Sequence, residues 1–386
     1  MPALLLKGIT WSHSRGVTPL LAAAQRFSEL FPDVSVTWTQ RSLQEFADKP
    51  LEALTEQYDL LVIDHPWVGR AAATGCVLPL DTLLPAAFLE DQARHSTGDS
   101  HPSYRYDGHQ WALALDAATP VASYRQDLLD RHQVSVPGTW NEVLALARRG
   151  KVAVPAIPID ILMNFYMFCI AHGALPFQCK DEVVDRVTGL VALETMQELY
   201  GLLDKKMFQL NPIGVAEVMT RTDDFWYCPF AYGYSNYTRR GYARTRLTYA
   251  DLVALRGNRL RSTIGGTGLA ISTRCIHMEE ALAFAQWVTS GECQSTFYLQ
   301  HGGQPAHRSA WVDAEANRLC NDYFRVVLPA MERGYTRPRY DGYLFFQDHG
   351  GDPLREALMG KRRPASALDE LNEVYRRSLA PENVHA

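Results

Sequence analysis

The first ninety residues alternate apolar strands with amphipathic helices, and this order restricts what the chain can fold into. The run Leu60–Ile63 is continuously apolar, as expected for a parallel strand that is covered on both faces. Leu4–Thr10 and Val34–Trp38 predict two further strands, and between them we expect Thr18 to cap a helix with Pro19 at its first position. Strands and helices in this order predict an open α/β sheet.

The composition and the net charge of the chain limit the kinds of molecule that we expect it to bind. Of the 386 residues, 47% are hydrophobic and 21% are charged, which is enough apolar material for a large core and excludes a disordered chain. The formal net charge of −5 gives no reason to expect a nucleic acid as partner. No run of about 18 apolar residues occurs, so we expect no membrane insertion. The expected partner is a small molecule, and the expected state is a monomer.

The N-terminus and the cysteines both favour a reducing compartment. Met1–Lys7 has no basic segment, no apolar stretch of about 7–15 residues and no small-residue cleavage signal. The seven cysteines are odd in number and show no C-x-x-C spacing, so we expect no disulfide framework. The sequence as written therefore predicts a cytoplasmic protein, and a periplasmic one if a leader has been removed.

Turn and cap signals indicate further elements downstream. Tyr106–His109 predicts a hairpin turn, and Thr139 with Glu142 forms a capping box at a helix start. The other expected elements are strands at 110–115 and 151–157, helices at 159–172, 185–204 and 278–290, and a glycine-broken turn within 262–272 that feeds a strand. The stretch 223–242 is unusual because it contains eight aromatic residues, which we interpret as helix and loop.

Two loops follow strands and are the first places to look for a ligand, because open α/β sheets bind ligands beyond the carboxyl ends of their strands. Their candidate ligand contacts are Trp11, His13, Arg15, Asp64, His65 and Trp67. Rings for stacking beside hydrogen-bond donors and a cation suit a polar or anionic group. The alternatives are a surface loop with a solvated Arg15, and Asp64 and His65 that cap the next helix.

Three segments in the correct order resemble a known family. They are YDLLVIDHPWVGRAAATGCVLPLD, then YDGHQWALALDAATPVASYRQDLLDRHQVSVPGTWNEVLALAR, then GGTGLAISTRCIHMEEALAFAQWVTSGECQSTFYLQHGGQPAHRSAW. Together they resemble family 1 of the bacterial extracellular solute-binding proteins of ABC importers, over about residues 5–155 and 262–312. The missing leader and the segment Val215–Met219, where relatives usually carry G-x-x-A-M, depart from the family pattern.

The resemblance implies an α/β, two-lobe periplasmic-binding-protein-like fold with an interlobe ligand cleft. The first lobe would comprise 1–115 with 265–315, and the second 116–264 with 316–386, including a helical C-terminus. The crossing segments would lie near Asp116 and Gly265. An exported protein of this kind would have the membrane subunit of an ABC importer as a second partner.

Further candidate ligand contacts lie outside the two loops: Asp116, Tyr232, Tyr234, Asn236, Gly266 and Gln304. Asp116 ends a crossing strand, and a structural aspartate at a hinge is an equal alternative. The tyrosines stand among Gly, Ser and Asn, a poor composition for a core, although eight aromatics together are more often core. Gly265–Gly268 resembles a phosphate loop but precedes a strand, so a close-packed turn is the stronger interpretation.

These observations favour a solute-binding protein, exported or cytosolic, that closes over a small polar ligand, with an organic anion slightly preferred over a sugar. No cofactor or metal is expected, since the twelve histidines show no ligand spacing, and His95 and His101 are expected to be exposed. One alternative is an enzyme on this scaffold that uses Cys228 as a nucleophile, similar to thiaminases. Another is a subunit that holds a protein partner.

Overall fold

The computed structural model describes residues 4–42 and 51–380, and the chain divides into two compact units. Unit 1 consists of Met1–Ala118, Ile264–Glu332 and Arg339–Asp341, and unit 2 of Thr119–Thr263, Arg333–Pro338 and Gly342–Ala386. Residues 1–3, 43–50 and 381–386 lie outside the described residues, and the first three belong to the segment Met1–Lys7 on which the predicted localisation depends.

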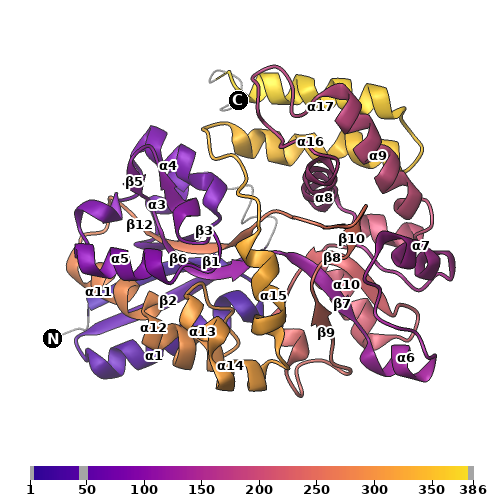
Figure 1. Ribbon diagram of the computed structural model, residues 1–386. Helices are drawn as coiled ribbons and strands as arrows, with labels where there is room; N and C mark the ends of the chain where they lie inside the picture. The colour runs from indigo at the N-terminus through magenta and orange to yellow at the C-terminus, as the bar shows by residue number, and fades with distance from the viewer. Residues whose placement is uncertain (1–3, 43–50, 381–386) are drawn as a thin grey trace. The chain divides into compact units, whose positions relative to one another are not determined.

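Unit 1 is built on a five-stranded sheet (Figure 1). Its strands are β1 (Leu4–Trp11), β2 (Val34–Arg41), β3 (Leu60–Ile63), β6 (Leu113–Ala118) and β12 (Gly265–Ile271), in the order β2-β1-β3-β12-β6. β1 is parallel to β2 and β3, whereas β12 is antiparallel to both β3 and β6. The carboxyl ends of β1, β3 and β6 and the amino end of β12 therefore share one edge of the sheet.

Helices cover both faces of this sheet, with α1, α12 and α13 on one side and α3 and α4 on the other (Figure 1). Phe27 of α1 packs edge-on against Phe284 of α11, with ring centroids 5.2 Å apart. The helices of unit 1 are α1 (Ser14–Leu30), α3 (Leu51–Thr55), α4 (Val68–Thr74), α5 (Ala86–Arg94), α11 (Met278–Thr289), α12 (Gly291–Cys293), α13 (Arg308–Val312), α14 (Ala314–Leu319) and α15 (Tyr323–Glu332). Unit 1 also contains the short 3-10 turns η1 (His65–Trp67), η2 (Leu80–Thr82) and η3 (Pro102–Tyr104) and the π-helical turn η6 (Gln294–Tyr298). A hairpin of β4 (Arg105–Tyr106) and β5 (His109–Gln110) completes the unit.

Helix α1 begins five residues earlier than the sequence predicts. The prediction placed the cap at Thr18 and Pro19 at the first position, but the cap is His13, whose side chain accepts a hydrogen bond from the backbone N–H of Arg15. Pro19 lies inside the helix. The capping imidazole supplies what the Thr18 hydroxyl was expected to supply, and it places Arg15 in the first helical turn instead of in a loop.

The segment 316–332, which the sequence analysis assigns to the second lobe, belongs to unit 1 in the structure. The indole of Trp311 contacts the ring of Phe324 at 5.2 Å, and Asn317 donates hydrogen bonds from its side chain to the backbone of Trp311 and Asp313. These contacts fold α14 and α15 back onto α13. The apolar face of α15 therefore completes the core of unit 1.

Unit 2 combines a small antiparallel sheet with a larger helical part. β7 (Pro120–Tyr124) is the central strand between β8 (Tyr227–Tyr232) and β9 (Thr248–Ala250), and β10 (Ala254–Leu255) pairs with β11 (Asn258–Arg259). The helices are α6 (Gln126–Arg131), α7 (Trp140–Arg148), α8 (Pro158–Ala171), α9 (Arg186–Tyr200), α10 (Pro212–Arg221), α16 (Tyr343–Leu358) and α17 (Pro364–Ser378), with 3-10 turns η4 (Lys205–Gln209) and η5 (Ser235–Thr238). The capping box of Thr139 and Glu142 is confirmed at the start of α7.

Two predictions of secondary structure in unit 2 need correction. Residues 151–157 form no strand and contribute only a bridge between Val152 and Tyr227, because Pro155 has no N–H to donate and Pro158 starts α8. The aromatic stretch 223–242, interpreted as helix and loop, contains strand β8. Three of its six residues are aromatic, a residue type that is common in strands, and β8 pairs with β7.

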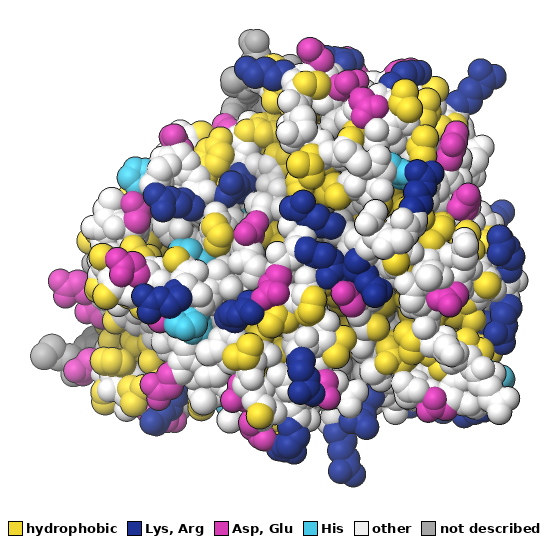
Figure 2. Space-filling model, in the orientation of Figure 1, with side chains coloured by type: hydrophobic (Ala, Val, Ile, Leu, Met, Phe, Trp, Pro, Cys, Tyr) yellow, Lys and Arg dark blue, Asp and Glu magenta, His cyan; other side chains and the backbone are white. Residues whose placement is uncertain are grey.

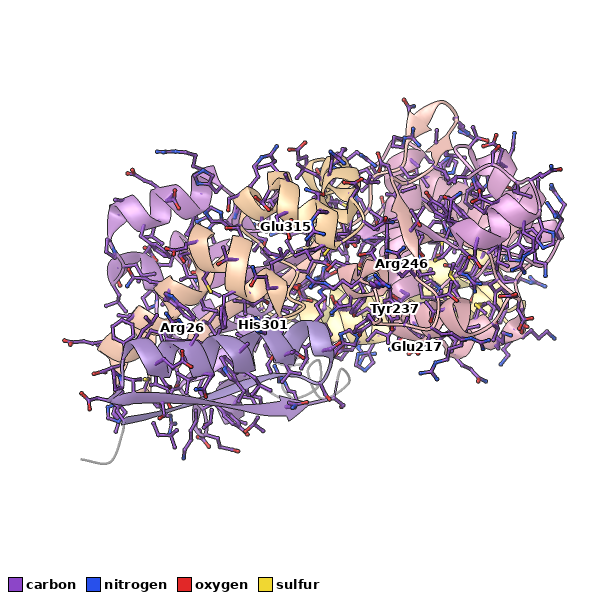
Figure 3. The ribbon with its side chains drawn as sticks, turned by 90° about the horizontal axis from the view of Figure 1, so that it is seen from below. Arg26, Glu217, Tyr237, Arg246, His301 and Glu315 are labelled. Atoms are coloured by element: carbon purple, nitrogen blue, oxygen red, sulfur yellow. The ribbon has the colours of Figure 1, made fainter. Side chains whose placement is uncertain are left out.

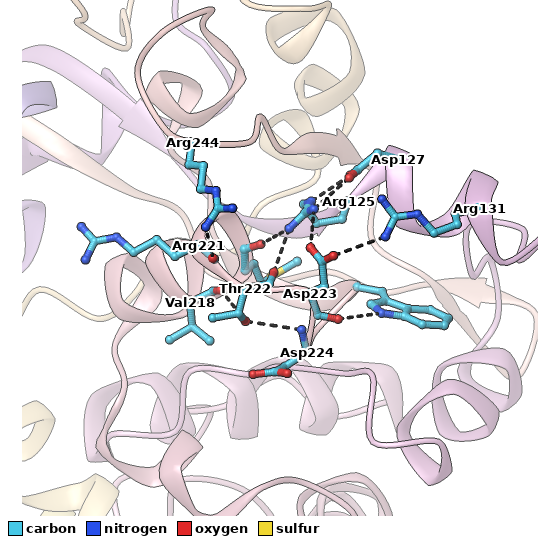
Figure 4. A network of polar contacts seen from close by, with 11 residues as sticks. Arg125, Asp127, Arg131, Val218, Arg221, Thr222, Asp223, Asp224 and Arg244 are labelled. Carbon is cyan, nitrogen blue, oxygen red and sulfur yellow. Dashed lines mark hydrogen bonds and ion pairs between the residues drawn. The ribbon is translucent and has the colours of Figure 1, made fainter.

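A buried arginine ties the sheet of unit 2 to the end of α10 (Figure 4). Arg125 follows β7 and donates at 2.8 Å to both carboxylate oxygens of Asp127 and to the backbone oxygens of Met219 and Thr222. It also reaches the carboxylate of Asp223 at 2.9 Å. Because the guanidinium group uses several donors at once, we interpret this network as one that stabilises the contact between the segment after β7 and the end of α10.

Charges on the visible surface are mixed in sign. In Figure 2, Lys and Arg side chains are interspersed with Asp and Glu side chains and with apolar patches. Within residues 4–42 and 51–380, no helix combines the length and the apolar character needed to cross a membrane.

Candidate functional site

The shared edge of the unit 1 sheet gathers most of the candidate residues. Trp11 is the last residue of β1, and Asp64 follows the last residue of β3. On the other side, Thr267 at the start of β12 pairs with Asp116 near the end of β6. The expectation that strand ends bring these side chains to one edge follows directly from the parallel register of β1, β3 and β6. We refer to this region as the unit 1 site edge.

An ion pair between Arg15 and Asp116 lies at the site edge. Arg15 Nε donates to one carboxylate oxygen at 2.8 Å and Nη2 to the other at 2.5 Å, and the two residues are only 3% and 2% exposed. The expected alternative of a solvated Arg15 is therefore wrong. Burial raises the pKa of the Asp116 carboxyl, and the adjacent guanidinium opposes the rise. The positive charge that favoured an anionic ligand is already matched by a carboxylate.

His13 is a neutral member of the site edge. Its Nδ1 accepts from the backbone N–H of Arg15 at 3.0 Å, so Nε2 carries the ring proton. The imidazole is stacked on the indole of Trp11, with centroids 5.4 Å apart and the ring planes nearly parallel. Burial, helped by the charge of Arg15, lowers the pKa of His13 to about 4. At neutral pH the ring of Trp11, which is 4% exposed, and the partly exposed ring of His13 thus form an uncharged stacked pair.

Asp64 and His65 form a turn at the end of β3. Asp64 Oδ1 accepts the backbone N–H of His65 at 2.8 Å and lies 3.2 Å from its imidazole Nδ1. This confirms that Asp64 caps η1, and the cap leaves 22% of its side chain exposed. His65 and Trp67 are buried. A partly exposed carboxylate held in place by the backbone N–H and the imidazole of His65 is a fixed hydrogen-bond acceptor.

Gly266 and Gln304 shape the backbone of the same edge. Gly266 has φ of +110°, and a Cβ there would lie 2.1 Å from the carbonyl oxygen of Asp116, so only glycine fits. Gln304 is fully buried, and its side-chain Nε2 donates to the backbone carbonyl of Ala117 at 2.8 Å. The backbone carbonyl of Gln304 accepts the N–H of Ala117 at 3.1 Å. Both residues hold β6 and β12 in position, and direct contact with a ligand stays a prediction for them.

The candidate residues of unit 2 lie around β8 and η5. Tyr232 shares a hydroxyl hydrogen bond of 2.8 Å with Thr263 Oγ1, and the hydroxyl of Tyr249 bonds to both backbone groups of Tyr234. Asn236 is 2% exposed within η5. These contacts fix the side chain of Tyr232 and the backbone of Tyr234, and contact of the three candidates with a ligand stays a prediction.

Other aromatics of the stretch 223–242 belong to the core, as the alternative interpretation expected. Tyr227, Phe230 and Tyr237 are fully buried. The hydroxyl of Tyr237 donates to Glu217 Oε1 at 2.8 Å, and both side chains are labelled in Figure 3. A buried tyrosine that satisfies its hydroxyl on a carboxylate is a packing residue.

Cys228 lacks the properties of a nucleophile. Its side chain is fully buried in β8, and burial raises the pKa of the thiol to about 12. The charge of Asp160 adds to this rise. A catalytic cysteine needs the opposite, a lowered pKa and access to substrate. The geometry gives no support to an enzyme that uses this thiol.

Sequence reasoning missed two residues at or near this region. Tyr298 is buried beside the Arg15–Asp116 pair, and a Cβ on Gly303 would lie 2.3 Å from its ring. His101, expected to be exposed, is buried, and burial lowers its pKa to about 4. No local pattern marks either residue, because both are buried by segments distant in sequence.

The comparison with protein families decides the assignment. The sequence pattern described as bacterial extracellular solute-binding protein matches residues 11–294. The chain belongs to this family. It is therefore a solute-binding protein of the ABC-transporter type. A maltotriose-binding protein of Pyrococcus abyssi is 25% identical over 120 residues, which is 31% of this chain, and the match spans only a quarter of that relative.

Solved solute-binding proteins share the fold along nearly the whole chain. A ribitol-bound ABC transporter protein of Agrobacterium radiobacter has 20% identity and a TM-score of 0.83, with 97% of this chain and 99% of that chain covered. Maltose-bound MalE3 of T. maritima has 16% identity and a TM-score of 0.82 with the same coverage. A tagatose-bound protein of Thermotoga lettingae has 17% identity and a TM-score of 0.82, with 98% and 100% covered. The predicted two-lobe α/β class of these solute-binding proteins is confirmed.

Proposed function

We propose that this solute-binding protein takes up a neutral sugar or polyol and presents it to the membrane subunits of an ABC importer. The observation that carries the proposal is the electrostatics of the unit 1 site edge. The charge of Arg15 is matched by Asp116, and His13 is uncharged at neutral pH. The other candidate groups at this edge are the stacked rings of Trp11 and His13 and the fixed carboxylate of Asp64. Aromatic faces and carboxylate acceptors suit the C–H faces and hydroxyl groups of sugars.

The relatives support the same ligand class. The ligands named for them are ribitol, maltose, tagatose and maltotriose, all of them polyhydroxylated and uncharged. The sequence preference for an organic anion depended on Arg15, His13 and His65. Since the first is neutralised and the second is uncharged at pH 7, that preference loses its main support. We therefore place neutral polyhydroxylated ligands first.

Thermal unfolding against a ligand panel tests the proposal. The panel contains ribitol, tagatose, maltose and maltotriose, with citrate, succinate and glutamate as anionic comparators. At 100 times its dissociation constant, a ligand that binds only the folded protein adds about 2.7 kcal/mol to the free energy of unfolding. We expect a rise in Tm with at least one neutral compound, which mass spectrometry should recover unchanged. Stabilisation by the anions alone would overturn the proposal.

Asp64 provides a sharper test of the site edge. Asp64→Asn removes the negative charge but keeps a side-chain oxygen for the cap. If the carboxylate accepts ligand hydroxyls, loss of the charge-assisted hydrogen bond costs about 1.5–3 kcal/mol, which weakens binding by about 10- to 150-fold. Isothermal titration calorimetry with the ligand found in the panel measures this change.

The matched control for this variant is Asp313→Asn. Asp313 caps α14 in the same unit by accepting the backbone N–H of Ala316 at 2.7 Å, but it is not part of the site edge. We expect the control to change Tm slightly and the affinity not at all. Equal affinities for both variants would remove Asp64 from the binding site.

A further inference from the structure

A second group of polar side chains lies in unit 1, away from the strand ends. Asp91 and His95 stand one helical turn apart at the end of α5, and His307 lies on the loop that enters α13. The ligand atoms of these three residues lie within 4.8 Å of one another. No sequence spacing indicates this cluster, because Asp91 and His307 are 216 positions apart.

The distances within this cluster fit the edges of a small coordination shell. Asp91 Oδ1 lies 2.9 Å from His95 Nδ1, and Asp91 Oδ2 lies 3.4 Å from His307 Nε2. Ligands about 2.0–2.1 Å from a tetrahedral Zn²⁺ are separated by about 3.3 Å. The two imidazole rings are nearly parallel, with centroids 4.8 Å apart. His95 Nδ1 also lies 3.1 Å from the backbone carbonyl of Asp91, so the exposed His95 ring has to rotate out of this contact and out of the stack for the three atoms to face one ion.

The surroundings of His307 hold its imidazole in one orientation. Its Nδ1 accepts the backbone N–H of Ser309 at 3.4 Å and lies 2.8 Å from the hydroxyl of the same residue, which leaves Nε2 directed at Asp91. The His307 side chain is 4% exposed, whereas those of Asp91 and His95 are 46% and 37% exposed. One ligand is therefore held rigidly by the core, and the other two are open to entering ions.

We propose that Asp91, His95 and His307 bind one Zn²⁺ ion, with water completing the coordination. Two imidazoles and one carboxylate are a ligand set that Zn²⁺ uses in proteins when one position stays open to solvent. The ion would join the end of α5 to the loop before α13 and so fasten unit 1 across a long stretch of chain. It would act separately from the proposed sugar site, so either proposal can fail without the other.

The test uses the full chain without a polyhistidine tag, treated with EDTA and then dialysed. Isothermal titration with ZnCl2 should show one site per chain, and Co²⁺ should give the intense visible absorption of a tetrahedral complex. His95→Gln and Asp91→Asn should each weaken this site by at least tenfold, and His307→Gln by more. Because His307 also caps α13, the partly exposed His95 provides the variant that leaves this cap in place.

His109→Gln is the matched control. His109 pairs with Asp81 at 3.1 Å in the same unit, but within the described residues no second imidazole joins that pair. We expect this control to bind Zn²⁺ as the unchanged protein does. The proposal is overturned if the unchanged protein binds no Zn²⁺ at micromolar concentrations. It is equally overturned if the His95 and Asp91 variants bind as tightly as the control, since the ion would then be held elsewhere.

Discussion

Replacing Asp116 by alanine is expected to lower the free energy of unfolding by about 3–5 kcal/mol. The reason is the guanidinium of Arg15, which would stay buried and lose both of its carboxylate hydrogen bonds. Arginine cannot escape this cost by losing its proton, because its pKa is too high. Urea unfolding followed by tryptophan fluorescence measures the loss.

Two comparison variants separate this effect from a simple loss of contacts. Arg15→Met combined with Asp116→Ala removes both charges, and we expect it to recover a large part of the stability because no uncompensated charge remains. Glu332→Ala breaks the exposed pair that Glu332 forms with Arg308 in the same unit, and it should cost less than about 1 kcal/mol. An Asp116 variant that is no less stable than the Glu332 variant would contradict the argument.

The sequence predicted the site edge of unit 1 better than it predicted the contacts there. Strand ends can be read from apolar runs, so the positions of Trp11 and Asp64 follow from local pattern alone. The pairing of Arg15 with Asp116 cannot be obtained in this way. It depends on the register of β12 against β6 and bridges 101 positions of sequence.

The wrong predictions have the same physical cause, which is packing between segments that are distant in the sequence. The cap of α1 was placed at Thr18 because hydroxyl caps are common, whereas the actual cap is an imidazole held by its stack on Trp11. The assignment of 316–332 to the second lobe failed because the amphipathic face of α15 does not say which core it joins. Local signals locate elements, and long-range packing decides their partners and the charge state of the candidate site residues.

The second large effect is expected from Asp160 in unit 2 and should appear as a dependence on pH. Asp160 lies in the first turn of α8, it is 6% exposed, and its Oδ2 has no hydrogen-bond partner among the described residues. Burial raises the pKa of this carboxyl from 3.8 to about 8. The folded chain therefore keeps a proton that the unfolded chain releases between about pH 4 and pH 8. Stability from this group falls as the pH rises through that range and levels off above it.

The variant Asp160→Asn isolates this contribution, because the amide is neutral at every pH. A proton held only by the folded state changes the free energy of unfolding by about 1.4 kcal/mol per pH unit. The stability of the variant relative to the unchanged protein should thus rise by about 2.7 kcal/mol from pH 5 to pH 7. Urea unfolding at pH 5, 6 and 7 measures it, with Asp352→Asn on the exposed face of α16 as the control. A difference that stays constant across these pH values would mean that Asp160 is ionised in the folded protein, and its burial would then require a partner that lies outside the described contacts.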